Sequence, residues 1–133
     1  MRHMLDTNIC IYLIKKRPPR VLRRLQRVNA TDVCISAITL SELEYGVSKS
    51  AHPDRNKMAL AGFLAPLEVL PYDDMAAREY GRLRAHLERN GTPIGSLDAL
   101  IAAHALSLGL TLVTNNEREF RRVPGLKLKN WTR

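Results

Sequence analysis

An acidic residue interrupts the apolar start of the chain, and this junction constrains the fold more than any other feature. Met4 and Leu5 precede Asp6, and the apolar stretch 9–14 follows after two residues. This order predicts a buried strand that runs directly into a helix. Ligands of open α/β sheets bind at the edge where the strands end, so we search for functional residues around Asp6.

Apolar runs and amphipathic segments alternate along the rest of the chain. Further strands are predicted at 33–36, 67–70, 110–114 and 126–131, with helices between them. Strands that alternate with helices imply right-handed crossovers and a mainly parallel sheet covered by helices on both faces. We therefore predict a three-layer α/β/α fold. The length of 133 residues suits one domain, residues 1–133.

The buried side of one helix and the start of another can also be predicted. In the helix that begins near Pro53, the spacing places Met58, Ala61 and Leu64 on the buried side. Ser96 is predicted to cap the helix that follows it.

The chain is strongly basic, with a formal net charge of +8 and a pI near 10.0. Its most basic segment is an amphipathic helix predicted after two prolines. This helix carries Arg20, Arg23, Arg24 and Arg27 around an apolar stripe. Such charge attracts polyanions. Both a solvated arginine-rich face and an RNA-binding face fit the pattern.

The apolar runs are too short to cross a membrane, because none reaches the roughly 18 residues that a spanning helix needs. The start of the chain also lacks the pattern of a signal peptide. We therefore expect a cytoplasmic protein without membrane contact. Cys10 and Cys34 lie in apolar surroundings without paired spacing, which predicts buried thiols rather than a disulfide or a metal knuckle.

Five polar residues flank the predicted strands. Asp6 follows the first strand, Glu42 lies early in the helix after the second, and Asp98 lies in the first turn of the helix before the fourth. Asn116 and Glu119 follow that fourth strand. If the first, second and fourth strands are neighbours, these side chains meet at one end of the sheet. Clustered carboxylates need a neutralising cation. All-oxygen ligands suit Mg²⁺ or Mn²⁺, which can activate water for phosphodiester cleavage.

Most of these residues also have a purely structural explanation. Thr39 and Glu42 fit a capping box, in which Glu42 would hold its own helix start. Asp98 would stabilise the positive end of its helix with or without a metal, and Asn116 fits a turn. Asp6 is the exception, because a charge within a buried apolar run is rare unless it is paired.

The chain resembles the VapC toxins of the PIN-domain ribonucleases in four motifs, which occur in the same order and at the same spacing over nearly its whole length. The motifs are 4–9 (MLDTNI), 41–46 (SELEYG), 93–102 (PIGSLDALIA) and 112–120 (LVTNNEREF).

The resemblance implies a PIN-like fold and a Mg²⁺- or Mn²⁺-dependent endoribonuclease that cleaves structured RNA, with transfer RNA as the expected substrate, and so inhibits translation and growth. It also implies a VapB-type antitoxin as inhibitor, a homodimer, and a toxin–antitoxin hetero-oligomer that binds operator DNA only through the antitoxin.

The same resemblance assigns roles to the polar residues. Asp6, Glu42 and Asp98 match the acidic core and are expected to be both catalytic residues and metal ligands. Asn116 falls where many PIN domains have a further aspartate, and Glu119 falls where another acid often stands. The carbonyl oxygen of Asn116 can coordinate a metal but brings no charge, so sites with one or with two metals both stay open.

Two other functions would make different demands on these residues. A phosphatase with an Asp-x-Asp motif needs a second carboxylate two residues after Asp6, where this chain has Asn8. A noncatalytic RNA-binding module would use the basic helices and leave the acids as helix caps. It predicts RNA binding that a chelator does not change, and no cleavage.

Overall fold

The structure is a computed structural model that describes residues 2–133, so Met1 of the predicted domain lies outside the described residues. Its elements are β1 (His3–Leu5), α1 (Thr7–Lys15), α2 (Pro19–Gln26), a 3-10 turn η1 (Ala30–Asp32), β2 (Val33–Ser36), α3 (Ala37–Lys49), α4 (Pro53–Leu64), β3 (Glu68–Leu70), α5 (Asp74–Arg89), α6 (Ser96–Leu108), β4 (Thr111–Val113), α7 (Glu117–Phe120) and β5 (Lys127–Lys129).

The five strands form one parallel sheet in the order β3-β2-β1-β4-β5. The chain first builds outward from β1 through β2 to β3. It then returns to the other side of β1 and adds β4 and β5. This order makes the first strand the neighbour of both the second and the fourth, which was the condition for the acids to meet.

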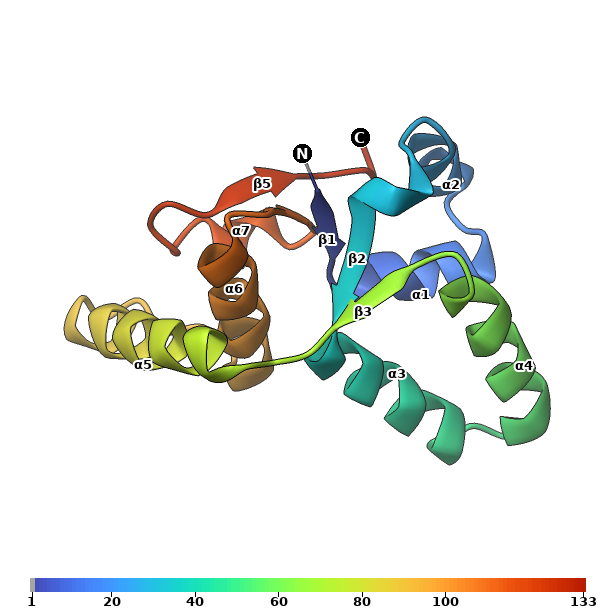
Figure 1. Ribbon diagram of the computed structural model, residues 1–133, viewed down its shortest axis with the longest axis horizontal. Helices are drawn as coiled ribbons and strands as arrows, with labels where there is room; N and C mark the ends of the chain where they lie inside the picture. Colours follow the sequence, from blue (N-terminus) through green and yellow to red (C-terminus); the bar gives the residue numbers. More distant parts are fainter. Residues whose placement is uncertain (1) are drawn as a thin grey trace.

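Helices cover both faces of the sheet (Figure 1). Successive strand residues point to opposite faces, so Met4 of β1 and Leu112 of β4 pack in the core beneath α5 and α6. Leu5 and Val113 point the other way, into the core beneath α1, α2, α3 and α4. The three-layer α/β/α fold predicted from the sequence is confirmed.

Of the three residues predicted to share the apolar side of α4, only Leu64 packs against the core. Leu60 is the buried residue of this helix, and Leu64 packs partly beside it. Met58 is 77% exposed and Ala61 is also exposed. Apolar residues occur all round the second half of α4, so the spacing alone did not select one face.

The predicted cap of α6 is also wrong by one residue. The cap position belongs to Gly95, and Ser96 is the first helical residue. No side chain caps this helix start. The backbone N–H of Gly95 donates a hydrogen bond to the carboxylate of Glu119.

The prediction of two buried thiols is confirmed within residues 2–133. Cys10 and Cys34 are buried free thiols. None of the described helices combines the length and the apolar character needed to span a membrane. His104 is buried, and its Nδ1 lies 2.8 Å from Oγ of Ser36.

Candidate catalytic site

The neighbouring strands β1 and β4 lead to connections on opposite sides of the sheet. Such a switch point is where open α/β sheets bind ligands. Asp6 follows β1 there, and Asn116 and Glu119 follow β4. Glu42 on α3 and Asp98 in the first turn of α6 approach the same edge.

Asp6 is both the N-cap of α1 and the most deeply buried acid of the site, with 4% of its surface exposed. Its Oδ1 accepts a 2.9 Å hydrogen bond from the backbone N–H of Ile9. Burial and, to a smaller extent, the charge of Glu42 raise the pKa of Asp6 to about 6. Hydrogen bonds from Thr114 and Ile9 oppose the rise. The protein therefore holds a carboxylate where burial disfavours its charge.

Glu42 does not cap its helix. Ser36 caps α3, because its Oγ accepts a 3.0 Å hydrogen bond from the backbone N–H of Ile38. Glu42 lies one turn further along, and its Oε1 accepts a 2.6 Å hydrogen bond from the hydroxyl of Thr7. The capping-box interpretation of Glu42 is therefore wrong, and its carboxylate faces the start of α1 instead.

The carboxyl groups of Asp98 and Glu119 interact and shift each other's pKa in opposite directions. Burial, followed by the charge and hydrogen bonding of Glu119, raises the pKa of Asp98 to about 7. Burial acts in the same direction on Glu119, but its hydrogen bonds outweigh this effect and lower its pKa. The backbone N–H of Gly95 donates to Oε1 of Glu119 at 2.6 Å, and Nδ2 of Asn116 donates to Oε2 at 2.7 Å. These donors therefore favour the charged form of Glu119, whereas the surroundings of Asp98 disfavour its charged form.

The four acids lie within electrostatic reach of one another. The charges of Glu119, Asp6 and Glu42 all raise the pKa of Asp98. As the side chains stand, however, no three His, Cys, Asp or Glu residues among 2–133 are arranged to hold one metal ion. Glu42 and Glu119 are turned toward protein donors instead. The donor set is nevertheless all oxygen and rich in negative charge, which suits Mg²⁺ or Mn²⁺.

Three residues that position the acids were missed at the level of sequence. Thr7 holds Glu42, and Thr114 hydrogen-bonds Asp6 while its Oγ1 accepts from the backbone N–H of Asn116 at 2.9 Å. Gly95 holds Glu119 through its backbone N–H, and a Cβ at this position would be in ordinary van der Waals contact with Oε1 of Glu119 and Oδ2 of Asp98, at 3.5 and 3.6 Å. The sequence does contain a signal for the two threonines. Each lies at the end of a central strand, where Thr7 is next to the acid Asp6 and Thr114 is next to the amide Asn115.

Comparison with known proteins agrees with this architecture. The sequence model of the PIN domain family matches residues 3–126, so the class of protein is that of the PIN domains.

The relatives narrow this class. The chain is 50% identical to the tRNA(fMet)-specific endonuclease VapC of Salmonella typhimurium over 131 residues, which cover 98% of each protein. It is 48% identical to the protein of the same name from Shigella flexneri, with 99% of each covered. A crystal structure of VapBC2 from Rickettsia felis, bound to a DNA fragment from its promoter, contains a chain that superposes with a TM-score of 0.93 at 46% identity. That match covers 98% of this chain and 99% of the other. The chain therefore belongs to the VapC ribonuclease family of PIN-domain proteins.

Proposed function

We propose that this protein is the toxin of a VapBC toxin–antitoxin pair. In this role it is a Mg²⁺- or Mn²⁺-dependent endoribonuclease that cleaves structured RNA, with transfer RNA as its substrate, and so inhibits translation and growth. The observation that carries the proposal is the convergence of four acids from separate parts of the chain. Asp6, Glu42, Asp98 and Glu119 meet at the switch point between β1 and β4.

The relatives support the substrate and the partner. The Salmonella and Shigella proteins are named as endonucleases specific for tRNA(fMet), and the Rickettsia structure is of a VapBC complex. The net charge of +8 also favours a polyanionic substrate. We assign the activity to the cytoplasm, where transfer RNA is found and where thiols such as those of Cys10 and Cys34 stay reduced.

Asp6, Glu42 and Asp98 would hold the metal, with Glu119 and the side-chain oxygen of Asn116 as further candidate ligands. When bound, Mg²⁺ or Mn²⁺ would lower the pKa of a water molecule and stabilise the charge that develops on the phosphate.

The protein's own groups keep two of these acids in place. The backbone N–H of Ile9 favours the ionised form of Asp6 against the effect of burial. The N–H of Gly95 does the same for Glu119. A bound cation would favour the charged form of all the acids, including Asp98, whose pKa is raised in the metal-free protein.

An apolar groove beside the site supports an antitoxin as partner. It lies between α1, α3 and α4, has a volume of about 350 Å³, and is lined by Ile11, Ile14, Val47 and Leu60 among others. Glu42 lines the same groove. A segment of antitoxin bound there would bury the apolar side chains and reach a candidate catalytic acid at the same time. We propose that the antitoxin inhibits the enzyme in this way.

The two other functions are less well supported. The second acid of an Asp-x-Asp phosphatase is absent, and Asn8 at that position is exposed on α1. The noncatalytic module requires Glu42 to be a helix cap, whereas Ser36 has that role.

The proposal is tested by incubating the purified protein with total cellular RNA in the presence of Mg²⁺, Mn²⁺ or a chelator, and then mapping the new RNA ends. We expect cleavage at a small number of positions in transfer RNA, only when metal is present. RNA binding without cleavage under every condition would support the noncatalytic module instead.

A further inference from the structure

Positive charge on this chain is concentrated at the end of α1 and on α2. Residues 15–27 contain seven Lys and Arg residues and no Asp or Glu. A segment with so little compensating charge produces a strong local field that attracts anions. Such a segment can bind an anion only through side chains that are not already paired within the protein.

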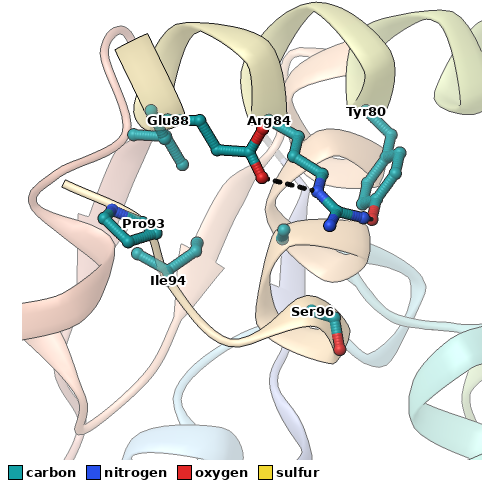
Figure 2. A pocket seen from close by; sticks show the side chains of 8 residues that line it. Tyr80, Arg84, Glu88, Pro93, Ile94 and Ser96 are labelled. Carbon is teal, nitrogen blue, oxygen red and sulfur yellow. Dashed lines mark hydrogen bonds and ion pairs between the residues drawn. The ribbon is translucent and has the colours of Figure 1, made fainter. Parts of the chain in front are cut away.

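Three of the four arginines of α5 are paired within the helix. Arg78 pairs with Asp74, and Arg82 pairs with Glu79. Arg84 lies between the hydroxyl of Tyr80 and the carboxylate of Glu88, as Figure 2 shows. Each of these guanidinium groups already has an acidic partner on its own helix.

The arginines of α2 are different. Arg20, Arg23, Arg24, Arg27 and the C-terminal Arg133 line a hollow of about 260 Å³, and no other type of residue lines it. We call this hollow the arginine cup. Arg23 and Arg27 take part in no side-chain hydrogen bond or ion pair within the described part of the chain.

The C-terminal segment forms one wall of the cup. Arg20 and Arg24 donate to the backbone oxygens of Thr132 and Arg133 at 3.4 and 3.0 Å. These contacts place the end of the chain against α2, as Figure 1 also shows. The side chain of Arg133 forms an ion pair with Glu117 of α7. The cup therefore adjoins α7, whose Glu119 belongs to the acidic site.

A second hollow lies between the cup and the acids. It has a volume of about 560 Å³, and Tyr12, Lys15, Arg17, Asn115 and Thr132 are among its lining residues. We call it the Tyr12 cleft. At one end, Asn115 lies between Thr114, which hydrogen-bonds Asp6, and the candidate ligand Asn116. At the other end, Thr132 accepts the hydrogen bond from Arg20 of the cup.

Polar and aromatic groups in the Tyr12 cleft suit a nucleotide. Nδ2 of Asn115 donates to the hydroxyl of Tyr12 at 2.9 Å, while its Oδ1 is buried and has no hydrogen-bond partner among residues 2–133. An aromatic ring beside cations is the usual platform for an unpaired RNA base and its phosphate. Guanidinium groups match phosphate oxygens through paired hydrogen bonds.

We propose that the Tyr12 cleft and the arginine cup form one RNA-binding groove, which carries the sugar–phosphate backbone of a structured RNA away from the acids. The proposal deepens the proposed function, because it says where the substrate lies beyond the scissile bond. The cup suits phosphate better than a folded protein partner, because its lining has no apolar side chain to form the core of a protein interface.

The test measures equilibrium binding of an intact transfer RNA to the whole protein in chelator, so that no cleavage occurs. The double variant Arg23→Gln/Arg27→Gln removes two free guanidinium groups and breaks no contact. The control Arg78→Gln/Arg82→Gln removes the same charge from α5, where both arginines are paired. Thermal unfolding of all three proteins shows whether each is folded.

We expect the α2 variant to bind transfer RNA about tenfold more weakly at low salt, while the α5 variant stays close to wild type. The slope of log affinity against log salt should fall by about 1.5 for the α2 variant, because each lost phosphate contact contributes roughly 0.7 to 0.9.

Equal loss of affinity in both variants would overturn the groove, because net charge alone would then explain it. An α2 variant that binds transfer RNA as tightly as wild type would also overturn it. The cleavage assay with Mg²⁺ is separate. If transfer RNA binds through Arg23 and Arg27 but is never cut by the wild type, the groove stands and the proposed function fails.

Discussion

The hydroxyl of Thr7 donates a 2.6 Å hydrogen bond to Oε1 of Glu42 and so joins the first residue of α1 to the second turn of α3. Thr7 directly follows Asp6, which caps the same helix. The start of α1 therefore positions both Asp6 and Glu42, which lie 36 residues apart in the sequence. This arrangement depends on β1 and β2 being neighbours, because each strand leads into one of the two helices.

The contact between Thr7 and Glu42 predicts that Glu42 acts in catalysis rather than in stability. Glu42→Gln should abolish most cleavage and change the free energy of unfolding by less than about 0.5 kcal/mol, because the helix cap is elsewhere. Ser36→Ala should show the reverse, with a loss of about 1 kcal/mol and cleavage retained. Chemical unfolding and cleavage rates of both variants check this. A stability loss in Glu42→Gln with normal cleavage would return Glu42 to a structural role.

The pKa of Asp6 predicts how the stability of the metal-free protein depends on pH. The pKa in the folded state, about 6, is above the ordinary value of 3.8. Between these values the folded state binds more protons than the unfolded state, so the contribution of Asp6 to stability falls as pH rises from about 4 to about 6. Asp98, with a pKa of about 7, extends the fall toward neutral pH.

The measurement is the unfolding free energy of wild type and Asp6→Asn in chelator across this pH range. As pH rises, the unfolding free energy of Asp6→Asn should increase relative to that of wild type. Addition of Mg²⁺ should restore the stability of the wild type. A constant difference would mean that Asp6 has no raised pKa.

Asn116 predicts the metal requirement of this chain. Its Nδ2 donates to Glu119, so an aspartate at 116 would place two carboxylates in contact. Their repulsion would be relieved when a cation binds between them. Asn116→Asp should therefore lower the Mg²⁺ concentration needed for half-maximal cleavage, and Asn116→Ala should not. Metal titrations at fixed ionic strength keep screening of the RNA from being mistaken for coordination. Three identical titration curves would make Asn116 a turn residue.

The apolar groove predicts a variant that escapes its antitoxin. Ala59 lines the groove, whereas Ala61 lies on the exposed side of the same helix outside it. Ala59→Arg should remain toxic when co-expressed with the neighbouring VapB-type protein, because a charged side chain fills the apolar binding surface. Ala61→Arg is the matched control and should still be rescued. Rescue of both variants would place the antitoxin elsewhere.

Much of the fold could be predicted because the spacing of apolar residues in β1 and β4 differs clearly from the spacing in the neighbouring helices. Asp6 could be singled out, since a charge beside buried Met4 and Leu5 is costly without a purpose. The buried side of α4 could not be predicted, because apolar residues such as Met58 and Leu60 occur on both of its sides. Only packing against α1 and α3 decides between them.

The candidate site could be predicted only as far as the acids. Their meeting depends on strand order, which no local pattern encodes. The residues that hold the acids in place were still harder to predict from the sequence. Thr7 and Thr114 look like ordinary strand-end threonines, and the pairing of Gly95 with Glu119 joins residues 24 positions apart.

The central claim is that buried Asp6 serves a metal-dependent ribonuclease, and cleavage of purified transfer RNA by wild type and Asp6→Asn tests it most directly. Both proteins are assayed in Mg²⁺ and in chelator, and their unfolding midpoints are measured alongside. Wild type should cleave only in Mg²⁺. Asp6→Asn should lose at least about 100-fold in rate while its unfolding midpoint stays equal or rises, because the variant no longer buries a charge. Cleavage by Asp6→Asn at the wild-type rate, or by wild type in chelator, would contradict the account.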